Sequence, residues 1–241
     1  MEIEEFKNLI LNYIGIQCGT DSEIYQEIVV RMQKLNVQKL SEEDYEHYYR
    51  QKVPNGWLPD GFYDPKERKV ILEDISNLSY VTIETTVHEC VHAVSHATIE
   101  KLGFKQYDMK LGNGFNEMAT CYITSKILNK GNGGGYSRDY RDVFKFFLET
   151  TKMSDKELII LFFGKDRWLT SELSNRFDSA HPEALTELVQ FYDIRVSKGF
   201  DEKRVLQIMQ DSAKTNGILQ DKNCKAIFDS YSDYWDLDYG R

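Results

Sequence analysis

Apolar residues recur at helical spacing over the first third of the chain, which predicts three helices there. The first covers residues 2–14 and has one apolar face, formed by Phe6, Leu9, Ile10, Tyr13 and Ile14. The second is predicted from Asp21, taken as its N-cap, to about Leu35. The third starts at Ser41, where Ser-Glu-Glu-Asp resembles a capping box. We expect these helices to form a lid or a side wall for the segments that follow.

The pattern changes after two turn signals, Pro-Asn-Gly at 54–56 and Pro-Asp-Gly at 59–61. Two short β-prone runs, 61–64 and 69–73, then flank a polar turn that begins with proline, which predicts an antiparallel hairpin. The second run ends shortly before the next helix. Its strand either pairs with an extended peptide through its backbone or is an internal strand of a small sheet.

Helical periodicity returns near Ser79 or Tyr80 and dominates the rest of the sequence. A second helix of this part is predicted from Phe115 to about Asn129. The glycine run 131–135 is a flexible break and not a phosphate loop, because it lacks the Gly-Lys-Ser/Thr ending. Further helices are predicted over 138–151, 155–163, 182–198, 202–214 and 222–231. The fold class that follows is α+β, predominantly helical, with a small antiparallel sheet.

The length of 241 residues allows one large domain or a domain with helical extensions. We divide the chain into an N-terminal helical region at 1–53, a central core at 54–130 and a C-terminal helical region at 131–241. The last region is expected to pack with the core as one unit.

Composition narrows the class of protein. A hydrophobic fraction of 41% with 13% aromatic residues is typical of a globular chain, and a net charge of −9 argues against nucleic-acid binding. No signal peptide is visible, and the longest apolar run, 158–163, is too short to cross a bilayer. The scattered cysteines suit a reducing compartment and form no zinc site of their own; they are Cys18, Cys90, Cys121 and Cys224. We therefore expect a cytoplasmic protein with no membrane partner.

The segment 85–92, Thr-Thr-Val-His-Glu-Cys-Val-His, carries the candidate chemistry. His88 and His92 are four positions apart, so on a helix both imidazoles lie on one face and can bind a single Zn²⁺ at about 2.0–2.1 Å. Glu89 can take a proton from the water that the metal activates. The apolar stripe that would face the core consists of Ile83, Val87, Cys90, Val91, Val94, Ala97 and Thr98.

A catalytic zinc needs a third protein ligand, for which four residues are candidates: Glu117, His96, Cys121 and His181. Glu117 is favoured, because it lies near the start of the next helix and the intervening connection lets that helix return beside the first. His96 continues the four-residue spacing but lies a further turn along the axis. It is better explained as a residue behind the ligands or on the surface, where it can pair with Glu100.

The His88-Glu89-x-x-His92 motif followed by Asn116-Glu117 resembles the gluzincin branch of the zinc metallopeptidases. The resemblance covers about residues 61–129 and implies a zincin-like core in which Glu117 is the third ligand. Three positions differ from neighbouring patterns. Ser95 and Thr98 replace the glycine and histidine of the metzincins, and Cys121 replaces the aspartate that orients a zinc-bound histidine in thermolysin-like enzymes. Thr120 or a residue elsewhere must then provide that orientation.

A looser similarity connects the chain with ImmA/IrrE-type bacterial peptidases, which combine a small hairpin, an HExxH helix and a glutamate-bearing helix. They act on intracellular regulators. For this chain the possible substrates include a regulator, peptides, or a host protein reached after delivery.

These observations predict a zinc metallopeptidase that acts on a peptide or protein substrate, with Glu89 as general base. The tetrahedral oxyanion needs a hydrogen-bond donor, for which His181 and Tyr136 are the candidates and Tyr140 is another choice. The simpler alternative is that His181 only flanks a helix and that the two tyrosines only pack in the core. Two alternatives remain. The chain is a metal-binding regulatory or interaction protein without turnover, or a helical interaction protein in which the motif is a coincidence.

Overall fold

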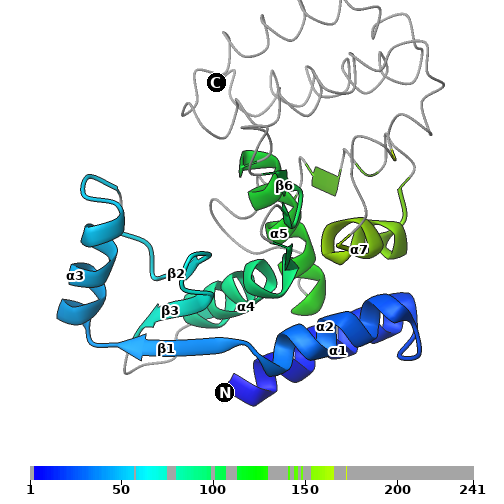
Figure 1. Cartoon of the computed structure of the whole chain (residues 1–241), viewed down its shortest axis with the longest axis horizontal. Coiled ribbons are helices and arrows are strands. Elements are labelled where there is room, and N and C mark those ends of the chain that lie inside the picture. The colour runs from blue at the N-terminus through cyan, green and yellow to red at the C-terminus, as the bar shows by residue number, and fades with distance from the viewer. Residues whose placement is uncertain are drawn as a thin grey trace, which may run out of the picture.

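The computed structural model describes residues 3–56, 58–74, 80–98, 101–106, 113–129 and 153–165, and the single positions 141, 144, 145, 148 and 172. Its elements follow one another as α1 (Ile3–Cys18), α2 (Glu23–Gln33), β1 (Asn36–Leu40), α3 (Glu42–Lys52), β2 (Gly61–Asp64), β3 (Lys69–Glu73), α4 (Tyr80–Ser95), β4 (His96–Thr98), β5 (Lys101–Leu102), β6 (Lys105–Gln106), α5 (Asn113–Ile127) and α7 (Asp155–Phe163) (Figure 1). The predicted class, α+β and mainly helical, is confirmed. The zincin-like assignment stays a prediction, as do the domain boundaries at 53 and 130. The helices predicted over 182–198, 202–214 and 222–231 lie outside the described residues.

Helix ends in the first part of the chain depend on serine caps. The Ser22 side chain accepts from the N–H of Tyr25 and starts α2, so the prediction of Asp21 as the N-cap is wrong by one residue. Ser41 caps α3 by accepting from the N–H of Asp44, as predicted. A serine hydroxyl satisfies a backbone donor that the first turn of a helix leaves without a partner.

The predicted hairpin is confirmed at its predicted bounds, with β2 and β3 antiparallel. The sheet that contains it is mixed and not purely antiparallel, because β1 pairs with β3 in parallel and gives the order β1-β3-β2. A parallel pair needs a long crossover, and here α3 and β2 supply it. β3 is thus an internal strand with a partner on each side. Of the two alternatives that the sequence left open for this strand, the internal strand is confirmed and pairing with a peptide is excluded, because both edges of β3 are occupied.

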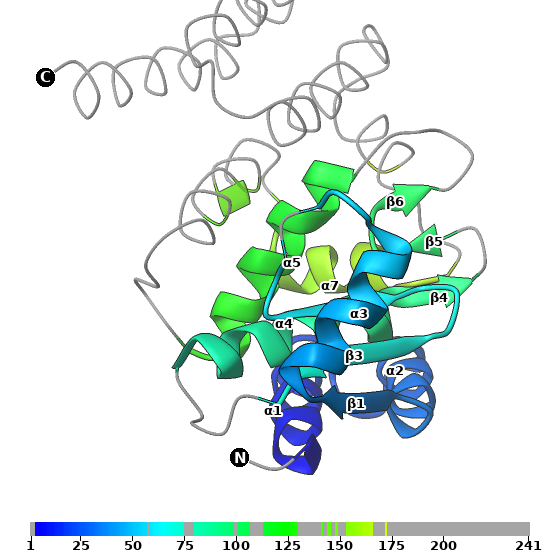
Figure 2. The same ribbon diagram turned by 90° about the vertical axis from the view of Figure 1, so that its left-hand side faces the viewer.

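Helices lie on both faces of this sheet, α3 on one and α4 on the other (Figures 1 and 2). The side chains of β3 reflect this, since Val70, Ile71 and Leu72 are all buried in succession. Side chains alternate between faces along a strand, so Ile71 points away from the face that Val70 and Leu72 share. A second small sheet, β4-β5-β6, follows α4 directly and was not predicted.

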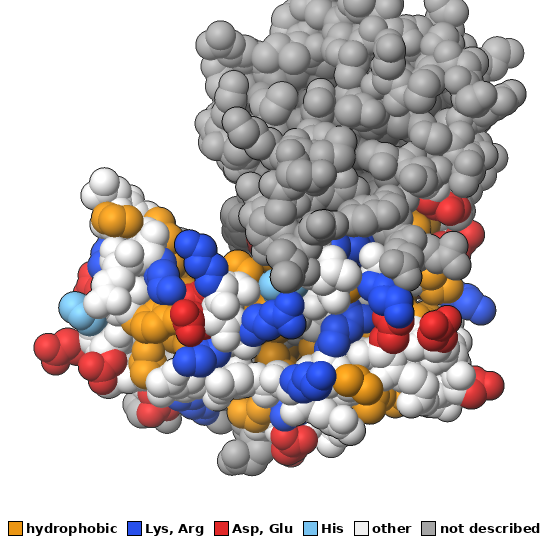
Figure 3. Space-filling view, in the orientation of Figure 1, with side chains coloured by type: hydrophobic (Ala, Val, Ile, Leu, Met, Phe, Trp, Pro, Cys, Tyr) orange, Lys and Arg blue, Asp and Glu red, His pale blue; other side chains and the backbone are white. Residues whose placement is uncertain are grey.

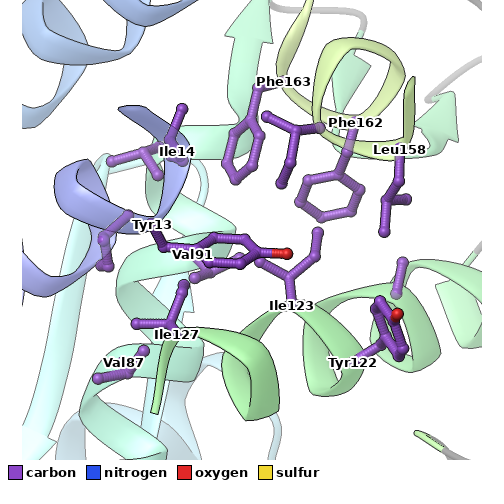
Figure 4. Packing of buried hydrophobic residues seen from close by; sticks show 14 of the residues in the cluster. Tyr13, Ile14, Val87, Val91, Tyr122, Ile123, Ile127, Leu158, Phe162 and Phe163 are labelled. Carbon is purple, nitrogen blue, oxygen red and sulfur yellow. The ribbon is translucent and has the colours of Figure 1, made fainter. Parts of the chain in front are cut away.

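The main core forms where α1, α4, α5 and α7 meet (Figure 4). α1 and α4 contribute the apolar faces that their periodicity predicts, and α7 contains the apolar run 158–163 that is too short for a membrane span. The labelled side chains are Tyr13, Ile14, Val87, Val91, Tyr122, Ile123, Ile127, Leu158, Phe162 and Phe163. The N-terminal helix is therefore part of the core that supports α4.

Two cations, the buried Lys101 and the half-buried Arg31, complete the C-terminal end of α7. The last carbonyls of a helix have no partner within it. Lys101 of β5 donates to the carbonyls of Leu161 (2.8 Å) and Phe162 (3.4 Å), and also to that of Gly164. Arg31 of α2 donates to the Phe163 carbonyl at 2.8 Å. Positive charge at a helix C-terminus also complements the helix dipole.

Arg31 joins two helix ends, because its guanidinium also donates to the Val94 carbonyl at 2.8 Å in the last turn of α4. Burial lowers the pKa of Arg31 to about 10, against the opposing effect of Glu27. Glu27 lies 3.7 Å from the guanidinium and 2.9 Å from Nζ of Lys165. The last turn of α4, which contains His92, is thus fixed to α2 and α7.

The described surface mixes charges of both signs. In the space-filling view, basic side chains gather in the middle of the described part of the face shown, and acidic side chains lie mostly toward its edges (Figure 3). The large apolar side chains that are exposed, Ile16, Val30 and Val53, belong to separate segments. Within the described residues, no helix has the length and hydrophobicity that a bilayer span requires.

Replacement of Lys101 tests the cationic cap. Lys101→Met should lower the free energy of unfolding by about 2–3 kcal/mol, because three buried carbonyls lose a charged donor. Urea denaturation measures this change. Lys39→Met, at an exposed position of β1, is the control and should change stability by less than about 0.5 kcal/mol. Equal stability of the two variants would contradict the assigned role.

Candidate metal centre

Two histidines of α4 face each other across one helical turn. The helix buries Val87, Cys90, Val91 and Val94 on its core side, as the apolar stripe predicts. His88 and His92 fall on the other side, and their Nε2 atoms are 3.0 Å apart. The four-residue spacing brings both imidazoles to one point because a helix turns once in 3.6 residues.

Glu117, in the second turn of α5, completes the group. One carboxylate oxygen lies 3.2 Å from Nε2 of His88, and the other lies 3.0 Å from Nε2 of His92. Among the described residues, these three form the group of side chains that could hold a metal ion, since their donor atoms all lie within 4.8 Å of one another. The favoured third residue of the sequence prediction is thus the one that the tertiary structure places beside both histidines.

The distances between the donor atoms fit a small cation. Four ligands at about 2.0–2.1 Å in a tetrahedron lie about 3.3 Å from one another. The observed separations of 3.0–3.2 Å approach this value. Glu117 is half-buried, so its carboxylate is largely removed from water while one side of the group can still be reached from solvent. These residues can hold a metal ion.

The two glutamates of the site have opposite electrostatic environments. Burial favours a raised pKa for Glu117, but the imidazoles of His92 and His88 outweigh burial and hold the pKa of this carboxyl well below its usual range. Burial raises the pKa of Glu89 to about 7, with Glu117 adding to the shift and His88 opposing it. Glu117 is therefore ionised as a ligand must be, whereas Glu89 titrates near neutral pH.

The backbone of β2 also contacts Glu89, which the sequence prediction missed. The N–H of Tyr63 donates to the Glu89 carboxylate and lowers its pKa slightly against the effect of burial. A backbone donor can come from a residue of any type, so no sequence signal marks it. Its consequence is a carboxylate fixed between α4 and the edge of the sheet.

The outer nitrogens of the imidazoles face uncharged groups of α5. Nδ1 of His92 lies 3.3 Å from Nδ2 of Asn116 and 3.4 Å from Oγ1 of Thr120. Nδ1 of His88 lies 3.9 Å from Sγ of Cys121. Burial keeps the pKa of the Cys121 thiol well above its usual range, so this group is a neutral thiol. Thr120 thus lies behind His92 and Cys121 behind His88. Thr120 is the residue that the sequence analysis named as a candidate for orienting a histidine.

Asn116 is itself held by a tight turn. Its side-chain oxygen accepts from the N–H of Phe104 at 2.9 Å. Gly103, just before Phe104, has φ of +57°, and a Cβ there would lie 2.2 Å from that oxygen and 2.7 Å from the Phe162 ring. Only glycine combines this backbone conformation with such a close approach.

The other predicted residues lie elsewhere. α4 ends at Ser95, and His96 opens β4 with its Nδ1 2.7 Å from the Tyr63 hydroxyl. It is buried, so of its two expected positions, behind the ligands or on the surface, the surface one is wrong. Glu100, its expected partner, lies outside the described residues. The candidates for an oxyanion donor, His181, Tyr136 and Tyr140, also lie outside them.

Comparisons of this chain with protein-family models, with curated proteins and with solved structures return no match.

Added Zn²⁺ should stabilise the protein through the three clustered residues. At a concentration of 100 times the dissociation constant, the gain in unfolding free energy is about 2.7 kcal/mol. Thermal unfolding measures it as a rise in Tm. His88→Ala, His92→Ala and Glu117→Ala should each abolish the rise, whereas His47→Ala, at an exposed position of α3, should retain it. A full response in Glu117→Ala would show that the third ligand is another residue.

Gly103→Ala should lower the free energy of unfolding by at least about 2 kcal/mol, since a methyl group there combines a strained φ with overpacking. The matched control is Gly15→Ala in α1, where the nearest side-chain atoms are 3.1 Å and 3.2 Å from the added methyl group and alanine is the better helix former. Chemical denaturation compares the two variants. Similar stabilities would refute the tight turn as the support of Asn116.

Proposed function

We propose that this chain is a zinc-dependent metallopeptidase that hydrolyses a peptide bond with an activated water and Glu89 as the general base. The observation that carries the proposal is the position of Glu89. Its carboxyl group lies close enough to the His88–His92–Glu117 cluster for His88 and Glu117 to act on its pKa. A proton acceptor beside a metal-ligand cluster is the arrangement that metal-assisted hydrolysis requires.

Zinc is the proposed metal because of the donor set. Two imidazoles and one carboxylate, with a fourth position left for water, are typical of catalytic zinc sites. Related first-row metals share these ligand preferences, so elemental analysis is needed to identify the ion. When bound, zinc would act as a Lewis acid that polarises the scissile carbonyl and lowers the pKa of water.

The residues of the chain supply the proton transfers. The Glu89 carboxylate accepts a proton from the attacking water and later donates it to the leaving amine. A pKa of about 7 suits both steps, because the group can gain and lose a proton near neutral pH. The Tyr63 N–H holds this carboxylate in place between the two steps.

We place peptide binding at β2. β3 has a partner on each side, whereas β2 pairs with β3 and with no other described strand. The Tyr63 N–H donates to Glu89, so the outer edge of β2 runs toward the proposed base. An extended peptide that adds to this edge would approach the metal centre with its backbone hydrogen-bonded.

The order of the elements supports the resemblance to gluzincins. A hairpin, a helix with the HExxH motif and a helix with the third acidic residue follow one another as β2-β3, α4 and α5. The looser similarity to ImmA/IrrE-type peptidases would make an intracellular regulator the substrate.

Glu89→Gln tests the proposed base directly. The amide cannot accept the proton, so peptide cleavage should fall by about 10²–10⁴-fold while zinc content stays at the wild-type value. A peptide library with mass-spectrometric detection measures cleavage. Zinc binding without cleavage in the wild-type protein would favour the alternative of a regulatory metal-binding protein.

The pH profile gives a second test. A base with a raised pKa is ionised above that pKa and protonated below it, so kcat/KM should fall as the pH drops through about 7 or lower, since bound zinc would reduce this pKa. Metal content measured at each pH separates loss of zinc from protonation of Glu89. Activity that stays constant down to about pH 4.5 with zinc retained would exclude Glu89 as the base.

A further inference from the structure

We infer that Thr120 is a positioning residue of the metal centre: its hydroxyl accepts a hydrogen bond from Nδ1–H of His92 and fixes the tautomer whose Nε2 can bind a metal. The inference rests on the proposed metal centre. Thr120 is fully buried in α5, and its Oγ1 is 3.4 Å from Nδ1 of His92. It contacts one of the clustered side chains and is not itself a member of the cluster.

The position of the proton on the imidazole decides which of its nitrogens can bind a metal. A neutral imidazole carries one N–H, and its other nitrogen keeps the lone pair that a metal needs. Nε2 is the nitrogen of His92 that faces His88 and Glu117. A metal can therefore bind there when the proton is on Nδ1, and a buried Nδ1–H requires an acceptor.

Two described groups lie within hydrogen-bonding distance of this Nδ1, the amide of Asn116 at 3.3 Å and the hydroxyl of Thr120 at 3.4 Å. The amide presents its nitrogen, because its oxygen is bound to the N–H of Phe104. An amide nitrogen donates and does not accept. Among the described residues, Thr120 is thus the acceptor for Nδ1–H.

A second hydrogen bond fixes the direction in which the Thr120 hydroxyl points its hydrogen. Thr120 donates its own hydrogen to the backbone carbonyl of Asn116 at 2.8 Å. Its oxygen lone pairs are left for Nδ1–H of His92. A continuous series of donors then runs from the imidazole through Thr120 to the helix backbone.

The amide of Asn116 favours the opposite tautomer. With Nδ1 as acceptor for Asn116, the proton would be on Nε2 and would point at Glu117, 3.0 Å away. Metal binding excludes this arrangement. Nδ1 of His92 can thus accept from Asn116 in one tautomer or donate to Thr120 in the other, and Thr120 stabilises the tautomer that binds metal.

Of the two histidines, His92 has the stronger hydrogen-bond acceptor behind it, which is the hydroxyl of Thr120. Behind His88 stands the Cys121 thiol, 3.9 Å from Nδ1, and sulfur is a weak acceptor. Removal of the Thr120 hydroxyl would leave neither imidazole with a strong acceptor among the described residues. We expect metal affinity to depend on it.

The experiment compares zinc dissociation constants of full-length variants by competition with a chelator. Thr120→Val has the same shape but no acceptor and should weaken zinc binding by about 10–100-fold, whereas Thr120→Ser should stay within about threefold of wild type. Thr124→Val is the matched control. Thr124 is a buried threonine one turn further along α5 whose hydroxyl has no hydrogen-bond partner among the described residues, so its replacement should leave zinc affinity unchanged.

Thr120→Ala provides a second variant without the hydroxyl, and unfolding of the metal-free proteins shows that each variant folds. Wild-type zinc affinity in the valine and alanine variants would overturn the inference and leave the metal centre intact. Equal weakening in the serine variant would assign the effect to the lost methyl group and would also overturn it. Failure of the wild-type protein to bind zinc would overturn the proposed metal centre itself.

Discussion

The packing of α4 against α5 holds together three groups that would otherwise separate. Two imidazole nitrogens and a carboxylate meet at 3.0–3.2 Å, where lone pairs point toward one another unless a proton or a metal lies between them. The lowered pKa of Glu117 shows how closely these groups interact. Burial opposes ionisation of this carboxyl, and the neighbouring imidazoles favour it more strongly. A divalent cation satisfies all three groups at once. The site and the interface between the two helices therefore depend on each other.

The surrounding structure makes this arrangement stable. Apolar faces of α1, α4, α5 and α7 form one core, so α4 is fixed along its length on the side away from the histidines. At its C-terminal end, Arg31 binds the Val94 carbonyl and also the end of α7, which Lys101 completes. These cations replace the water that exposed helix ends would bind. A ligand helix with both a packed face and a fixed end can keep its histidines in position.

Local signals were sufficient for part of this fold. The predicted hairpin and the helix at 155–163 have the predicted bounds, and α4 starts where the periodicity indicates. The strand β1 was missed because it is short and mostly exposed, and what makes it a strand is its pairing with β3. The sheet β4-β5-β6 was missed for the same reason, since two of its strands have two residues each. Strand pairing is a long-range property and leaves little trace in so few residues.

The sequence by itself determined what depends on one helical turn: that His88 and His92 share a face, that Glu89 is next to them, and that an apolar stripe lies behind them. It also made Glu117 the favoured third residue. Only the tertiary structure decided which groups meet across elements. The Glu117 carboxylate lies beside both imidazoles, the Tyr63 N–H reaches Glu89, and Thr120 stands behind His92 while His96 leaves the helix. These relations join residues far apart in the chain, and packing, not local spacing, sets the distances between them.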